Sequence, residues 1–293
     1  MKKGILALLL FLALNFCGTV TTERPAAALS QPSEDVPAVT ILPNPFQPEA
    51  PETGEAEQEA EPQTRMVDAS RPMVALTFDD GPHPQYTDQI LDILEENGAV
   101  ATFFEVGQKL STAPEAVRRA EGLGCEIGSH SYRHANLGKL EPEALEADLA
   151  AADAAFEEVL GTAPTLLRPP YGATSKALKE SSGYSIVTWS VDPQDWKSRD
   201  AEQVVAHVQG IGSLDGQVIL LHSIYESSVE AARTLVPWLQ EQGYQLVTVS
   251  ELITLRFGDA LEPNRLYNYD YFRCPPSLPE HQEVHQPGIQ VSA

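Results

Sequence analysis

Short apolar runs alternate with longer amphipathic segments between about residues 71 and 257. The short runs are rich in β-branched and aromatic residues and end at turn residues, which predicts buried strands. The longer segments repeat apolar residues every three or four positions, which predicts helices. We expect strands at 73–78, 102–106, 126–129, 166–168, 185–191, 218–222 and 246–249. We expect helices at 86–97, 114–122, 141–160, 201–209 and 229–243.

This alternation of strands and helices predicts an α/β fold with a mostly parallel sheet. About seven repeats favour a sheet that curls into a distorted, incomplete (β/α) barrel of TIM-barrel type over an open sheet. In such a barrel the chemistry lies where the strands end. The range 71–257 is long enough for a single domain with a sizeable core.

The first 20 residues predict a secretory leader. Lys2 and Lys3 precede an apolar run that is too short to span a bilayer comfortably. Leu14 and Cys17 are typical of a lipoprotein signal, the alanines at 26–28 suit a conventional signal peptidase, and an uncleaved anchor is the third alternative. All three alternatives predict that the rest of the protein is extracellular or on a bacterial cell surface. The protein is expected to contact the membrane only through its leader, if the leader is retained or lipidated.

The composition changes on either side of the predicted domain. Residues 21–70 are rich in proline and acid, with nine acidic and two basic residues between positions 21 and 65, which predicts a disordered linker. The range 258–293 is predicted to be a partly disordered C-terminal extension because it ends in a proline-rich run. The net charge of −23 argues against a nucleic-acid partner. We expect a monomer.

Two adjacent carboxylates, Asp79 and Asp80, follow the first predicted strand. Neighbouring residues of a strand point in opposite directions, so the two acids are expected to have different tasks, one toward a metal and one toward a substrate. A surface turn is the alternative, because Asp-Asp-Gly-Pro is also common turn chemistry.

His130 and His134 are four residues apart, a spacing that places both on one face of a helical turn and suits one metal ion. With Asp80 as a third ligand, such a site keeps positions open for water and substrate, which predicts catalysis. A capped turn with two surface histidines is the alternative.

Three further stretches contain candidate residues, and each also has a structural interpretation. Prolines 169 and 170 stiffen a loop that can fix the guanidinium of Arg168 and the backbone amide of Tyr171, or that can be only a rigid connection with a solvent-facing arginine. Asp195 and Trp196 can orient a distant histidine and form the wall of a sugar site, or can belong to an ordinary turn with a packed tryptophan. His222 ends an apolar strand, where a histidine is catalytic only if it shares its site with a metal.

In this order and spacing, the five stretches resemble the polysaccharide deacetylase family, carbohydrate esterase family 4 or the NodB homology domain. The sequence is most similar to the secreted bacterial members that act on N-acetylglucosamine of peptidoglycan. The resemblance implies a hydrolase of linear amides that removes N-acetyl groups from a cell-wall polysaccharide. It also implies a divalent metal, usually Zn²⁺ with Co²⁺, Ni²⁺ or Mn²⁺ as alternatives, held by Asp80, His130 and His134.

The resemblance also implies a role for each remaining candidate. Asp79 would act as general base and pair with Arg168, and His222 would act as general acid and pair with Asp195. The metal would polarise the acetamide carbonyl and a water molecule, and the backbone N–H of Tyr171 would stabilise the oxyanion. Two residues would line the acetyl pocket, Trp196 and Leu220.

Several alternatives stay open at this stage. The substrate can be chitin or an exopolysaccharide, the reaction can be removal of O-acetyl groups from xylan, or the protein can bind glycans without catalysis. Cys125, Ser129 and Ser223 depart from residues that are common in the family. Cys125 and Cys274 can form a disulfide outside the cell or remain two thiols.

Overall fold

A computed structural model describes residues 65–273 and 289–291, which belong to one compact unit. The predicted leader, Cys17, Cys274 and most of the predicted linker lie outside the described residues. At the edge of the unit, β1 (Arg65–Val67) pairs antiparallel with β10 (Ile289–Val291). Within the described ranges, none of the helices combines the length and apolar character needed to cross a bilayer.

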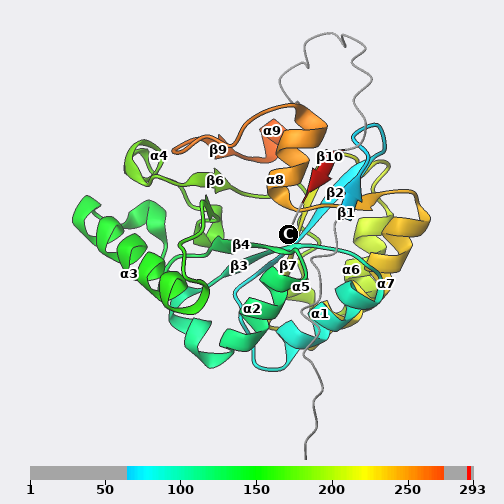
Figure 1. Ribbon diagram of the computed structural model, residues 1–293, viewed down its shortest axis with the longest axis horizontal. Helices are drawn as coiled ribbons and strands as arrows, with labels where there is room; N and C mark the ends of the chain where they lie inside the picture. Colours follow the sequence, from blue (N-terminus) through cyan, green and yellow to red (C-terminus); the bar gives the residue numbers. More distant parts are fainter. Residues whose placement is uncertain (1–64, 274–288, 292–293) are drawn as a thin grey trace, which may run out of the picture. The chain divides into compact units, whose positions relative to one another are not determined.

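The centre of the unit is a curled parallel sheet around β2 (Met73–Asp79) (Figure 1). Its order is β7-β2-β3-β4-β5-β6-β9, and β8 pairs with the start of β2. These strands are β3 (Thr102–Glu105), β4 (Glu126–Ser129), β5 (Leu166–Leu167), β6 (Ser185–Val187), β7 (Gln217–His222), β8 (Gln245–Leu246) and β9 (Leu266–Tyr267). The predicted fold class, an incomplete α/β barrel of about seven parallel strands, is confirmed.

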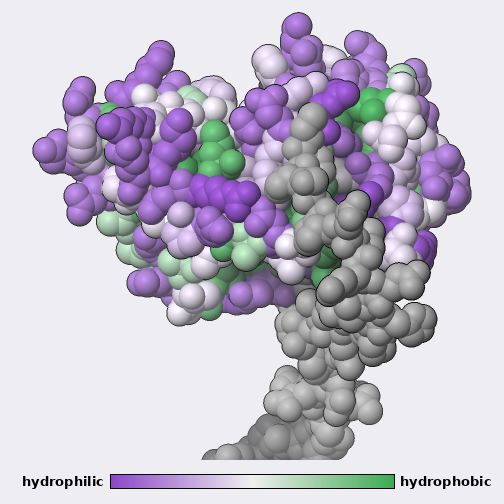
Figure 2. All heavy atoms as spheres, turned by 90° about the horizontal axis from the view of Figure 1, so that it is seen from above, coloured by the Kyte–Doolittle hydropathy of each residue, from purple (hydrophilic) through white to green (hydrophobic). Residues whose placement is uncertain are grey.

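Five longer helices surround the curled sheet on its outer side (Figure 1). They are α1 (Tyr86–Glu96), α2 (Pro114–Gly122), α3 (Pro142–Leu160), α6 (Ala201–Gln209) and α7 (Glu226–Glu241). The shorter helices are α4 (Lys176–Ser181), α5 (Asp195–Ser198), α8 (Val249–Glu251) and α9 (Tyr269–Arg273). The face shown in Figure 2 is mainly hydrophilic, with small separate hydrophobic areas.

The alternation of side chains along β2 directs its last carboxylate into the barrel. Leu76 and Phe78 pack in the same apolar cluster as residues of α1 and α7, on the outer face of the sheet. Ala75 lies in the cluster on the other face, which fills the barrel. Because successive strand residues point to opposite faces, Thr77 and Asp79 also face the interior. All seven residues of β2 are buried, so this direction is fixed by packing.

Two predicted strands are too long by several residues. The strand predicted at 185–191 ends at Val187, because the N–H groups of Ser190 and Val191 donate to the carbonyl of Val218 on β7, at 3.0 and 3.1 Å. This segment therefore crosses from β6 to β7. The strand predicted at 246–249 ends at Leu246, because Thr248 forms a capping box that starts α8.

The folded unit also extends beyond the predicted bounds of 71–257. Val67, which falls in the predicted linker, is buried. Leu266 and Tyr267, in the predicted extension, form β9 and pair with β6, and Phe272 is buried in the same apolar cluster as Tyr267. These side chains add apolar surface to the core, which stabilises segments whose overall composition suggested disorder.

We predict that Gly128→Ala destabilises the fold. A Cβ at this position would lie 2.6 Å from two ring carbons of Phe104, so the ring must shift. Overpacking of this kind costs about 1–3 kcal/mol, measured as the free energy of unfolding in urea. Gly122→Ala is the matched control, because its Cβ would meet nothing within 4 Å in a helical residue and should leave stability unchanged or raise it. Equal stability of the two variants would contradict this account of the core.

Candidate active site

The predicted site residues come from the ends of several parallel strands that meet at one edge of the sheet. Asp79 ends β2 and His222 ends β7, and the two residues are partners in the register of these strands. His130 follows β4 and Arg168 follows β5. The structure thus brings together residues that are far apart in the sequence, at the position expected for a (β/α) barrel.

Asp80, His130 and His134 form a cluster that suits a metal ion. Oδ1 of Asp80 lies 3.3 Å from Nε2 of His130 and 3.0 Å from Nε2 of His134. Each residue offers a ligand atom, and these atoms lie within 4.8 Å of one another. Nδ1 of His130 is 2.6 Å from the carbonyl oxygen of Arg168, which assigns the proton to Nδ1 and leaves a lone pair on Nε2.

The chemistry of this donor set fits a divalent cation. Oδ1 of Asp80 is buried, and no group in the described part of the chain donates a hydrogen bond to it. Two imidazoles and one carboxylate are common ligands of Zn²⁺ in sites that keep an open coordination position. Burial alone would raise the pKa of Asp80, but the close approach of His130 and His134 lowers it below its usual range.

The prediction that His130 and His134 share a helical turn is wrong. The segment after β4 is an irregular bend in which Ser131 and His134 have φ angles of 65° and 57°. The N–H of Tyr132 donates to buried Asp148 on α3 at 2.8 Å, which holds the bend. The backbone reversal, and not the periodicity of a helix, turns the two rings toward Asp80.

Asp79 and Arg168 form a buried ion pair beside this cluster. Arg168 is fully buried, and its Nη1 lies 2.8 Å from Oδ1 of Asp79 and 2.6 Å from the hydroxyl of Thr77. Its guanidinium also stacks on Phe104, 4.0 Å from the ring centroid. Oδ2 of Asp79 lies 3.9 Å from Nε2 of His130. One carboxylate oxygen therefore faces the cation, and the other faces the candidate metal site.

His222 and Asp195 form the second predicted pair. Nδ1 of His222 lies 2.8 Å from Oδ1 of Asp195, which is fully buried. Oδ2 of Asp195 accepts hydrogen bonds from the backbone N–H of His222 and from Ser228, at 2.8 and 2.6 Å. Burial alone would lower the pKa of His222, but the hydrogen bond and charge of Asp195 raise it, with smaller contributions from Asp79 and Asp80.

The three remaining predicted residues surround the site in different ways. Tyr171 is largely exposed, has a φ of 63°, and places its ring 4.9 Å from that of His134. Trp196 is about half exposed at the start of α5, next to Asp195. Leu220 is buried on β7, two residues before His222, so both side chains point to the same face of the sheet.

Sequence reasoning missed three polar residues that support the site. Ser228 binds Asp195, as described above, and Lys109 donates to the carbonyl of Asp80 at 2.8 Å. Glu105 is buried, and its Oε2 has no hydrogen-bond partner among the described residues. Burial, together with the charges of Asp79 and Asp80, raises the pKa of Glu105 to about 8 despite the opposing charge of Lys109. No motif marked these positions, although an acid inside a predicted strand was a usable signal for Glu105.

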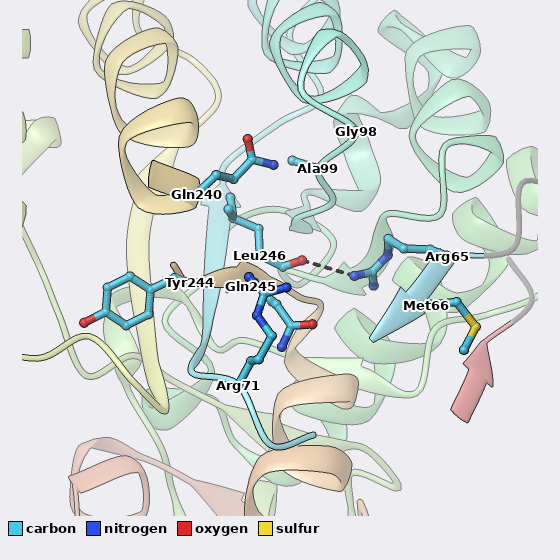
Figure 3. A pocket seen from close by; sticks show the side chains of 9 residues that line it. All are labelled: Arg65, Met66, Arg71, Gly98, Ala99, Gln240, Tyr244, Gln245 and Leu246. Atoms are coloured by element: carbon cyan, nitrogen blue, oxygen red, sulfur yellow. Dashed lines mark hydrogen bonds between the residues drawn. The ribbon is translucent and has the colours of Figure 1, made fainter. Parts of the chain in front are cut away.

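A separate cavity of about 290 Å³ lies at the opposite ends of the strands (Figure 3). Arg65 crosses it and donates to the carbonyl of Leu246 at 3.2 Å. The other lining residues are Met66, Arg71, Gly98, Ala99, Gln240, Tyr244 and Gln245. None of the lining side chains is a carboxylate, histidine or cysteine, so this cavity offers no general base and none of the usual metal ligands.

The sequence and fold resemble those of known carbohydrate deacetylases. The polysaccharide deacetylase family matches residues 66–187. Peptidoglycan-N-acetylmuramic acid deacetylase PdaC of Bacillus subtilis is 40% identical over 191 residues, which is 65% of this chain and 41% of the relative. The chain thus spans about two fifths of that relative. A solved PdaC structure superposes with a TM-score of 0.63 at 39% identity, covering 65% of this chain and 94% of that one.

Two further relatives extend the comparison. A peptidoglycan-N-acetylglucosamine deacetylase of Bacillus cereus is 39% identical over 62% of this chain and 88% of its own length. A family 4 acetyl xylan esterase from Clostridium thermocellum, solved with a cobalt ion, has a TM-score of 0.62 at 35% identity and covers 67% of this chain and 98% of that one. The chain belongs to the polysaccharide deacetylase family.

Proposed function

We propose that the protein hydrolyses N-acetyl groups of N-acetylglucosamine residues in peptidoglycan. The observation that carries the proposal is the pairing on either side of the Asp80 cluster, with Asp79 held by Arg168 and His222 held by Asp195. A protein that only binds glycans does not need both a base and an acid. Both relatives named for peptidoglycan deacetylation support peptidoglycan as the polymer, and the Bacillus cereus relative supports N-acetylglucosamine as the sugar.

Asp80, His130 and His134 would hold a divalent metal, Zn²⁺ first and Co²⁺, Ni²⁺ or Mn²⁺ as alternatives. When bound, this ion would supply Lewis-acid polarisation of the acetamide carbonyl. Oδ2 of Asp79 takes a proton from the attacking water while Arg168 keeps Oδ1 in place.

The tetrahedral oxyanion receives a hydrogen bond from the backbone N–H of Tyr171, in a loop stiffened by two prolines. His222 holds its proton at Nε2 and gives it to the leaving nitrogen, so that the carbon–nitrogen bond breaks to acetate and an amine. Trp196 and Leu220 enclose the acetyl group.

Removal of O-acetyl groups from xylan is the second candidate, favoured by the likeness to the acetyl xylan esterase. The same base and oxyanion contacts also suit an ester. An alkoxide leaves more readily than an amide nitrogen does, so hydrolysis of an ester depends less on the proton of His222. Comparing acetate release from acetylated xylan and from N-acetylglucosamine oligomers decides between the two.

The extracellular location of the protein and the roles of its predicted leader and linker belong to the same proposal. A peptidoglycan substrate requires a site outside the cytoplasm, which agrees with the leader expected at 1–20 and the acidic linker expected before the catalytic domain. The linker would let a monomer, secreted or attached by its leader, reach the wall.

We predict that Asp79→Asn lowers kcat by about 10²- to 10⁴-fold, because the general base is lost. Acetate release from N-acetylglucosamine oligomers is the measurement. Metal stoichiometry should stay at the wild-type value, since Asp79 is outside the Asp80, His130 and His134 set. Full activity of a correctly folded Asp79→Asn variant would contradict the assigned role.

We predict that chelation removes activity and that one equivalent of Zn²⁺ restores it. His134→Gln should lose stoichiometric metal, measured by elemental analysis after dialysis, because one of three ligands is gone. His207→Gln is the matched control, as His207 lies on α6 and not in the cluster. Activity that survives complete removal of the metal would exclude this part of the proposal.

We predict that Asp195→Asn moves the alkaline limb of the kcat/KM profile to lower pH. The carboxylate raises the pKa of His222, so its loss lowers that pKa, and the acid form then disappears at lower pH. Asp192→Asn, a nearby acid that accepts a hydrogen bond from the N–H of Gln194, should leave the limb in place. An unshifted limb in Asp195→Asn would show that His222 is not the titrating acid.

A further inference from the structure

Arg199 holds a guanidinium at the entrance to the proposed active site. It follows α5, which packs against β7 beside the site (Figure 1). Nε of Arg199 donates to the carbonyl of Trp196 at 2.8 Å, and the guanidinium lies 3.3 Å from the centroid of the Tyr225 ring. A hydrogen bond on one edge and an aromatic face below fix the direction of an exposed cation.

Tyr225 connects this cation to the proposed general acid. The rings of Tyr225 and His222 have their centroids 5.8 Å apart. Arg199, Tyr225 and His222 therefore form a row that leads from the solvent to the reacting centre. Trp196, which holds Arg199 through its carbonyl, presents a half-exposed indole on the same short helix, where a sugar ring can stack.

The charge of Arg199 has no protein partner in the described part of the chain, where no carboxylate oxygen lies within 4.0 Å of it. Most described arginines do have such a partner: Arg65, Arg118, Arg119, Arg133, Arg168, Arg233, Arg256 and Arg265. The acid next in sequence, Asp200, caps α6 by accepting from the N–H of Gln203 at 3.1 Å. Among the described arginines, only Arg71 and Arg273 also lack a carboxylate within 4.0 Å, and they bind the carbonyl of Gly243 and the hydroxyl of Tyr269.

We propose that Arg199 binds a carboxylate carried by the glycan close to the acetamido group that is removed. The planar guanidinium matches a carboxylate, and its stack on Tyr225 reduces the entropy lost on binding. This inference rests on the proposed deacetylase function and deepens it, because it makes the preferred substrate an acidic glycan. In peptidoglycan the carboxylate is the lactyl group of muramic acid or an acidic group of its peptide, whereas chitin has none.

The test compares three glycans of equal length with the metal-loaded enzyme: neutral N-acetylglucosamine oligomers, peptidoglycan strands stripped of peptide, and strands that keep the peptide. Arg199→Gln should lower kcat/KM on a carboxylate-bearing glycan about tenfold more than on the neutral oligomer, mostly through KM, since an exposed charged hydrogen bond is removed. The stripped strand identifies the lactyl carboxylate, and the peptide-bearing strand identifies the peptide.

Two controls separate recognition from structure. Arg233→Gln makes the same charge change at an exposed position of α7. It should leave unchanged the ratio of kcat/KM on a carboxylate-bearing glycan to kcat/KM on the neutral oligomer. Arg199→Lys keeps the charge without the planar fork and should recover part of the ratio. The preference of the wild type for acidic strands should also fall as salt is raised from about 0.05 to 0.5 M.

An equal loss on all three glycans in Arg199→Gln would overturn the inference, because it would assign Arg199 to the structure of α5 alone. Wild-type turnover of the neutral oligomer checks the proposed function separately from this inference. If the wild type is inert on every glycan, the proposed function fails, and equilibrium binding of the stripped strand and of the peptide-bearing strand to wild type and to Arg199→Gln still decides the role of the arginine. Equal affinities in that experiment would also overturn it.

Discussion

The site depends on how the chain leaves β2. In a continued strand, Asp80 would point to the outer face of the sheet together with Phe78, while Asp79 points inward. Asp80 instead has a φ of 72°, and Lys109 holds its carbonyl, so its carboxylate also turns toward His130. Two adjacent acids thus reach the same space from different sides. This single change of direction lets one carboxylate serve as a base and its neighbour serve as a ligand.

The two carboxylates need compensating positive charge, because the side chains of Asp79 and Asp80 are only 3% and 15% exposed. Arg168 compensates Asp79 from inside the barrel, and a divalent cation would compensate Asp80 from the open side. The buried pair of Asp79 and Arg168 contributes more to position than to stability, since desolvation offsets much of the attraction. On the other side of the site, Asp195 accepts hydrogen bonds from the hydroxyl of Ser228 and from the backbone N–H of His222. These two bonds leave the carboxylate of Asp195 little freedom to move.

The order of strands and helices and the curled sheet could be predicted from the sequence, because β2 and its neighbours are continuous apolar runs separated by amphipathic helices. The grouping of Asp80, His130 and His134 could be predicted from their motifs, but its geometry could not, because left-handed residues such as Ser131 and His134 have no periodic signal. Glu105 and Arg199 were missed for a similar reason, since burial and missing partners depend on contacts between distant segments. β9 was missed because its two residues come after the alternating pattern of the predicted domain, in a segment whose proline-rich end suggested disorder, although Tyr267 packs in the core.

The most direct measurement is anomalous diffraction at the zinc edge from crystals of the protein grown with one equivalent of Zn²⁺. The account predicts a single ion about 2.0–2.2 Å from Oδ1 of Asp80 and from Nε2 of His130 and His134. It also predicts that Asp79 stays on Arg168 and does not ligate the ion. An ion bound elsewhere, or one that takes Asp79 as a ligand in place of Asp80, would contradict the division of tasks between the two carboxylates.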